Sequence, residues 1–107
     1  MTMKNFDDLI SAASDEYDLP APLLKGLIRQ ESNFDPTARN SKSGAIGIAQ
    51  FLPGTAEEVG IDPNDPAQSI FGAAYYLRQQ IDRFGSIDKG LAAYNWGQGN
   101  LGKAIEK

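Results

Sequence analysis

The sequence predicts an all-α fold, and three observations support that prediction. Apolar residues recur at three- and four-residue spacing in several segments, which is typical of amphipathic helices. Glycines and prolines separate these segments, and no stretch alternates polar and apolar residues for long enough to predict a strand. At 107 residues, the chain is long enough for one domain with a core of its own. We therefore expect a single compact domain over residues 1–107, with little or no β-structure.

The first half of the chain predicts two helices followed by a long loop. The first helix is marked by an apolar stripe of Phe6, Leu9, Ile10, Ala13 and Tyr17. Pro22 suits the first turn of a second helix, since its missing N–H costs nothing there. This second helix should end near Glu31 or Ser32, because Pro36 prevents much continuation. The irregular segment from Asp35 to about Phe51 should be functional, as loops of this length in small domains usually are.

The second half predicts further helices. A short helix is expected over residues 52–60, where Thr55 and Glu58 have the spacing of a capping box. The longest helix is expected over residues 67–84, and another over residues 88–94. A break should then follow at Gly97, Gln98, Gly99 and Asn100. A short tail helix should end the chain, anchored by Leu101 and Ile105.

Composition excludes several kinds of chemistry. The chain has no cysteine and no histidine, which rules out disulfides, thiolate or histidine metal ligands and a Ser-His nucleophile. Any acid–base chemistry must therefore come from Asp, Glu, Lys or Tyr. The net charge is −4 and the ten cationic residues are scattered, so we expect neither a nucleic-acid partner nor an electrostatic membrane anchor.

No targeting or membrane segment is predicted. The N-terminus has no apolar run typical of a secretory signal, and no run of about 18 apolar residues predicts a membrane span. We expect an excised domain, a mature form or a protein exported by another route.

One carboxylate lies on an apolar helical face. Glu31 comes four residues after Leu27 and three after Ile28, so it continues their stripe toward the core or a crevice. Desolvation there should raise its pKa, because the ionised form loses more hydration than the neutral form. A Glu that is protonated near neutral pH can act as a general acid. The alternative is a frayed last turn, with Glu31 in solvent or paired with Arg29 or Lys25.

Two further segments carry polar groups suited to a binding site. Residues 41–50 include glycines that let the backbone approach another group closely, and Gln50 can both donate and accept hydrogen bonds. If this segment is taken alone, the alternative is that residues 41–50 form an ordinary surface loop. Tyr94 offers a hydroxyl and Asn95 an amide, beside Trp96. Core packing with a helix C-cap is the alternative there.

Together these segments resemble the lysozyme-like catalytic domain of the soluble lytic murein transglycosylases, from about Leu19 to Leu101. Glu31-Ser32 is similar to the catalytic Glu-Ser pair of that family. Residues 41–50 resemble its Ser-x-x-Gly-Ala-x-Gly-Leu-Met-Gln motif, and a similar Pro-Gly-Thr-Ala follows at residues 53–56. Ala93-Tyr94-Asn95 matches its Ala-Tyr-Asn motif.

The resemblance implies a compact lysozyme-like domain with an active-site groove for peptidoglycan. It implies that Glu31 protonates the glycosidic oxygen between N-acetylmuramic acid and N-acetylglucosamine. Glu31 would then take a proton from the muramyl 6-hydroxyl, which gives a 1,6-anhydro product without water. The same resemblance implies that four residues line the groove or support Glu31, namely Ser41, Gln50, Tyr94 and Asn95. We expect no cofactor and no metal ion.

The chain departs from the family pattern in three places. Ile48-Ala49 replaces the usual Leu-Met, which should thin one wall of the groove. Trp96 stands where a small residue is common, and Gln98 where Pro is common. We expect Trp96 to fill the core, with a sugar-stacking platform as the alternative.

The carboxylates favour intramolecular attack over hydrolysis. Most glycoside hydrolases use two carboxylates, and no second one has an obvious place beside Glu31. Asp35 precedes Pro36 at a turn, where we expect it to cap or face solvent, and Asp62 and Asp65 belong to another turn.

Two other functions stay open. One is a g-type lysozyme-like hydrolase with water as the nucleophile and an Asp to position it. The other is a non-catalytic peptidoglycan-binding or assembly module, for example within a secretion or phage apparatus. In each case the expected partner is the peptidoglycan glycan strand, in the bacterial periplasm or cell wall, and the expected state is a monomer.

Overall fold

The protein folds as an all-α domain, which confirms the predicted fold class. The computed structural model describes residues 6–106, and the side chains of residues 6–96. Its five helices, in chain order, are α1 (Phe6–Glu16), α2 (Ala21–Ser32), α3 (Pro53–Val59), α4 (Pro66–Phe84) and α5 (Ile87–Glu106). Within this described part, β-pairing is limited to isolated antiparallel bridges from Ile46 to Arg39 and to Phe51. None of the described helices is long and apolar enough to cross a membrane.

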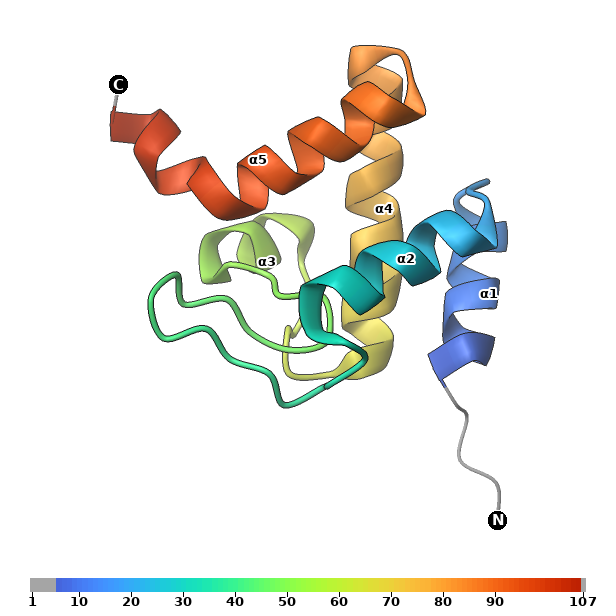
Figure 1. Cartoon of the computed structure of the whole chain (residues 1–107), viewed down its shortest axis with the longest axis horizontal. Coiled ribbons are helices and arrows are strands. Elements are labelled where there is room, and N and C mark those ends of the chain that lie inside the picture. Colours follow the sequence, from blue (N-terminus) through green and yellow to red (C-terminus); the bar gives the residue numbers. More distant parts are fainter. Residues whose placement is uncertain (1–5, 107) are drawn as a thin grey trace.

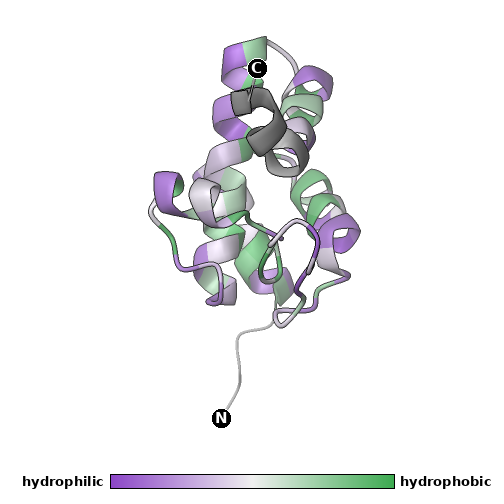
Figure 2. Cartoon of the chain, turned by 90° about the vertical axis from the view of Figure 1, so that its left-hand side faces the viewer, coloured by the Kyte–Doolittle hydropathy of each residue, from purple (hydrophilic) through white to green (hydrophobic). Residues whose placement is uncertain are grey.

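The helices are arranged around α4. Figure 1 shows α4 running through the middle of the molecule, with α1 and α3 on opposite sides and α2 and α5 crossing it. Each of the four other helices contacts α4. In Figure 2 the helices carry hydrophobic and hydrophilic residues in alternation, as expected of amphipathic helices packed on a shared core.

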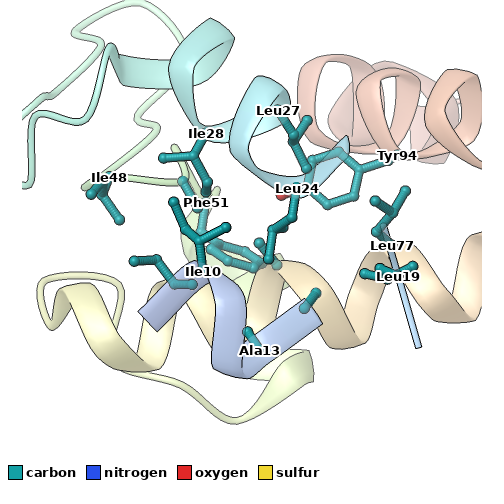
Figure 3. Close-up of a cluster of buried hydrophobic side chains, with 14 of the residues drawn as sticks. Ile10, Ala13, Leu19, Leu24, Leu27, Ile28, Ile48, Phe51, Leu77 and Tyr94 are labelled. Atoms are coloured by element: carbon teal, nitrogen blue, oxygen red, sulfur yellow. The ribbon is translucent and has the colours of Figure 1, made fainter. Parts of the chain in front are cut away.

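The core joins these helices to the loop between α2 and α3. Its largest fully buried apolar side chains are Ile10, Leu24, Ile28, Ile48, Phe51, Ile70, Leu77 and Tyr94. Figure 3 shows side chains from α1, α2, α5 and the loop meeting in this cluster. Because residues 48–51 contribute to it, the loop is held against α2 by apolar burial and is not a loose surface excursion.

Local signals place the end of α2 where the sequence predicts it. Pro22 lies in the first turn, and the helix ends at Ser32. Asn33 then adopts the left-handed conformation, with φ 55°, and its N–H donates to the carbonyl of Arg29 at 2.8 Å. This ending fixes Glu31 in the last turn of a well-defined helix, so the frayed turn considered from the sequence is not what forms.

Two expectations about helix ends are wrong. The capping box at Thr55 and Glu58 does not form, because the N-cap residue of α3 is Leu52, three residues before Thr55, and Pro53 lies in the first turn. Thr55 therefore lies inside the helix and is buried.

The break predicted at residues 97–100 is also wrong, since α5 continues to Glu106. Glycine in a helix costs only about 1 kcal/mol relative to alanine, and Gln98 keeps the backbone N–H that a proline would remove. At 20 residues α5, not the 19-residue α4, is the longest helix. The side chains of Leu101 and Ile105, expected as anchors, lie outside the described residues.

Candidate active site

Glu31 occupies a half-buried position in the last turn of α2. It follows the buried Leu27 and Ile28 on the same helical face, as its spacing predicts. Burial raises the pKa of the Glu31 carboxyl above its ordinary value of 4.5, because desolvation penalises the ionised form. Glu31 thus keeps some access to solvent while holding its proton to higher pH, which is what a general acid requires.

Ser32 connects the end of α2 to the following loop. Its hydroxyl donates to the carbonyl of Ile48 at 2.6 Å and accepts from the N–H of Asp35 at 3.1 Å. The first bond spans sixteen residues and ties the loop beside Glu31. Sequence reasoning noted the Glu-Ser pair without finding this role, which depends on where the loop returns.

The loop facing α2 is cross-linked by its own polar groups. Ile46 and Phe51 exchange two backbone hydrogen bonds, at 2.9 and 3.1 Å. Gln50 is only 9% exposed, and its amide nitrogen donates to the carbonyls of Ala38 and Gly47 at 3.1 and 2.9 Å. Gln50 therefore stabilises the loop through hydrogen bonds within it. Its contact with substrate stays a prediction.

Ser41 lies in an exposed turn of the same loop. The side-chain oxygen of Asn40 accepts from the N–H groups of Lys42 and Ser43, at 2.9 and 3.1 Å, and so shapes that turn. Asn40 was missed by sequence reasoning, although an Asn followed by Ser-Lys-Ser-Gly is a turn signal. The groove role of Ser41 stays a prediction.

Tyr94 is fully buried on α5, whereas the neighbouring Asn95 is exposed. Figure 3 shows the Tyr94 ring beside Leu24 and Leu27 of α2, one helical turn before Glu31. On its other side Tyr94 meets Tyr76 of α4, with ring centroids 5.2 Å apart and an interplanar angle of 58°. Tyr76 was not singled out from the sequence. The substrate-binding roles of Tyr94 and Asn95 stay predictions.

Two expectations about groove shape are corrected. Ile48 and Ala49 are both fully buried, so this departure from the family pattern lies in the core and not on an open wall. Trp96 is 53% exposed, so it does not fill the core. It lines a cavity together with residues of α3 and α4.

The three aspartates considered as second carboxylates all serve turns or caps. The Asp35 carboxylate is exposed and accepts from the N–H and hydroxyl of Thr37, at 2.9 and 2.7 Å, and these bonds lower its pKa. Asp62 accepts from the N–H of Asn64 at 3.0 Å, and Asp65 caps α4. These contacts confirm the predicted capping and turn positions.

In the described part of the chain, no three Asp or Glu side chains lie close enough together to hold a metal ion.

A family model described as the transglycosylase SLT domain matches residues 8–107 of this chain. The chain belongs to the transglycosylase SLT domain family. Membership confirms the family expected from the sequence, while the functional roles of Glu31-Ser32, residues 41–50 and Ala93-Tyr94-Asn95 stay predictions. Within this SLT domain, those three segments converge around the end of α2, through the Ser32 bond to Ile48 and the packing of Tyr94.

Several proteins are similar to this SLT domain. It is 39% identical over 98 residues to a transglycosylase of Enterobacteria phage PRD1, covering 89% of this chain and 37% of that protein. It is 42% identical over 97 residues to membrane-bound lytic murein transglycosylase F 2 of Alkalilimnicola ehrlichii, covering 83% and 21%. It is 36% identical over 107 residues to a peptidoglycan transglycosylase of Escherichia phage T7, covering 92% and 8%. The chain thus spans 8% to 37% of the length of these relatives.

Proposed function

We propose that this domain is a lytic transglycosylase that cleaves the β-1,4 bond between N-acetylmuramic acid and N-acetylglucosamine in bacterial peptidoglycan. The observation that carries this proposal is Glu31, a half-buried carboxyl with a raised pKa at the end of α2 in an SLT domain. The names of the relatives, which include lytic murein transglycosylase and peptidoglycan transglycosylase, support peptidoglycan as the substrate.

In the first step, protonated Glu31 gives its proton to the glycosidic oxygen. The bond from that oxygen to the muramyl anomeric carbon breaks through an oxocarbenium-like transition state, and N-acetylglucosamine leaves with a free hydroxyl. In the second step, the muramyl 6-hydroxyl oxygen bonds to the anomeric carbon and its proton returns to Glu31. The carboxyl is restored, no water is consumed, and the new end is 1,6-anhydromuramic acid.

Proximity supports the intramolecular nucleophile. The 6-hydroxyl is tethered to the reacting sugar, and well-oriented tethered groups reach effective molarities of about 10⁵–10⁸ M. Water competes only where a second carboxylate holds and activates it. Asp35, Asp62 and Asp65 are each bonded within turns or caps, so none is free for that work without rearrangement.

Digestion of purified sacculi in ¹⁸O-labelled water tests this proposal. We expect unlabelled 1,6-anhydromuramic ends, each lighter by one water than a reducing end, in the mass spectrum of the released muropeptides. Label in most new muramyl ends would establish hydrolysis instead, and Asp35, Asp62 and Asp65 would then be tested by substitution as the water-positioning carboxylate. Sacculi left uncut by folded protein would favour the non-catalytic binding module.

A further inference from the structure

A cavity of about 840 Å³ lies between α3, α4 and α5, and Glu31 is not among the residues that line it. In Figure 1, α5 crosses one end of α4 and extends over the side on which α3 lies, and these three helices supply the lining residues. The lining side chains include Glu58 of α3, Gln80 and Arg83 of α4, and Trp96 of α5. The volume falls within the range of about 300–1,000 Å³ that is usual for small-ligand sites.

The cavity presents aromatic rings to solvent. Trp96 and Phe84 both line it and are 53% and 44% exposed, which makes them the two most exposed large apolar side chains of the described residues. The Arg83 guanidinium lies over the Phe84 ring, 5.3 Å from its centre, in a cation–π contact at the same wall. Flat apolar rings beside planar polar groups suit a ligand that has one apolar face and polar edges.

Hydrogen-bond donors and acceptors surround these rings. The Gln80 amide can donate and accept, which matches the hydroxyl and acetamide groups of an amino sugar. Tyr76 also lines the cavity, and its pKa is raised by burial and by Glu58, and lowered in part by Arg83. The Tyr76 hydroxyl therefore lies within electrostatic reach of an acidic and a basic side chain.

The cavity adjoins the Ala-Tyr-Asn motif. Ala93 and Trp96 line it on either side of the buried Tyr94. Tyr76, from the cavity wall, is in ring contact with Tyr94 at 5.2 Å. Tyr94 thus packs between α2, the helix that carries Glu31, and Tyr76 of the cavity wall.

We propose that this cavity binds an N-acetylhexosamine unit of the glycan strand away from the cleaved bond, with Trp96 as the stacking platform. The inference rests on the glycan strand being the substrate. The lining carries Arg83 and Lys89 against Glu58, so the sugar is favoured by the exposed Trp96 and Phe84 rings and the Gln80 amide, not by charge.

Trp96 is the only tryptophan of the chain, which makes it a reporter for its own site. The test uses Glu31→Gln protein, which holds saccharide without cutting it, titrated with a linear N-acetylglucosamine tetramer. We expect a saturable blue shift of tryptophan emission as the sugar covers the ring. By calorimetry, Trp96→Ala in the same background should weaken binding at least ~10-fold, as truncation of a central aromatic contact does.

Tyr75→Ala is the matched control, since Tyr75 is another exposed aromatic of α4 that does not line this cavity. We expect it to leave tetramer affinity within about twofold, with thermal melts confirming that each variant is folded. The proposal would be overturned by an unchanged emission spectrum at saturating tetramer, by equal loss in the two variants, or by a response to free stem peptide alone. Because the readout is binding, it is independent of whether wild-type protein forms anhydro ends.

Discussion

At the residue scale, Glu31 and Ser32 are neighbours in the last turn of α2 but serve different purposes. The Glu31 carboxyl has a pKa raised by burial, and the Ser32 hydroxyl bonds to Ile48 and Asp35 across the start of the loop. The helix turn sets the two side chains about 100° apart around its axis. Glu31 can therefore keep its access to solvent while Ser32 holds the loop against the end of α2.

Replacing Glu31 with Gln should abolish cleavage and preserve the fold. Gln has nearly the same volume but cannot deliver a proton, and general acid–base help alone is worth about 10²–10⁴-fold. Turbidity clearing of purified sacculi measures the rate. Glu57→Gln, an exposed carboxylate on α3, is the control and should clear at the wild-type rate. Wild-type clearing by the Glu31 variant would remove Glu31 from the mechanism.

Replacing Tyr94 with Phe should lower activity about 10-fold, which corresponds to the loss of one hydrogen bond in the transition state, and cost no more than ~1.5 kcal/mol of stability. The ring, which packs in the core and against Tyr76, is kept. We expect its hydroxyl to support Glu31, since buried tyrosine hydroxyls normally have partners. Sacculus clearing and urea unfolding provide the two measurements. If Asn95→Ala loses activity while Tyr94→Phe does not, the exposed amide is the functional member of the pair.

At the element scale, the loop from Asp35 to Phe51 depends on close backbone approach at Gly47. Gly47 has φ +83°, and a Cβ there would lie 2.1 Å from the carbonyl oxygen of Pro63. The Ser69 hydroxyl donates to the same oxygen at 3.1 Å, which fixes it in place. The loop is thus seated on the connection before α4 through a position where only glycine fits.

Replacing Gly47 with Ala and, in a second variant, Gly44 with Ala distinguishes the cost of backbone strain from the cost of the close contact with Pro63. Gly44 has φ +82° with open space around it, so Gly44→Ala should cost only the ~1–2 kcal/mol of a left-handed residue. Gly47→Ala should cost a further ~1–3 kcal/mol from overpacking against Pro63. Urea unfolding of both variants measures the difference. Equal losses would show that the loop moves aside without cost.

The helices themselves were largely predictable from local pattern, whereas their ends and exposed faces were less so. The apolar spacing correctly predicted that Glu31 lies on the same helical face as Leu27 and Ile28, because residue spacing fixes the face within a single helix. The exposure of Trp96 depends on where α5 crosses α4, and the need for Gly47 depends on the distant Pro63. Such facts follow from tertiary packing, which a local pattern does not contain.

At the scale of the whole molecule, the buried acid links activity to stability. Folded protein holds the Glu31 proton at pH values where the unfolded chain has released it, since the folded pKa is raised above 4.5. The stability that this group contributes is therefore present in full below the unfolded pKa and is lost as pH rises through the folded pKa. The lowered pKa of Asp35 acts oppositely, because its contribution is lost as pH falls below the ordinary value of 3.8.

A comparison of wild type with Glu31→Gln across pH isolates the first effect. Gln does not ionise, and the Asp35 contribution is the same in both proteins and cancels. We expect the melting temperature of the variant, relative to wild type, to increase from pH 4 upward and to level off once Glu31 is ionised in the folded protein. The same ionisation should remove the general acid, so wild-type cleavage should decline over the pH range in which the variant gains its advantage. Scanning calorimetry and sacculus clearing at matched pH give both curves, and a melting-temperature difference that stays flat from pH 4 to 8 would mean that Glu31 titrates as an ordinary surface carboxylate.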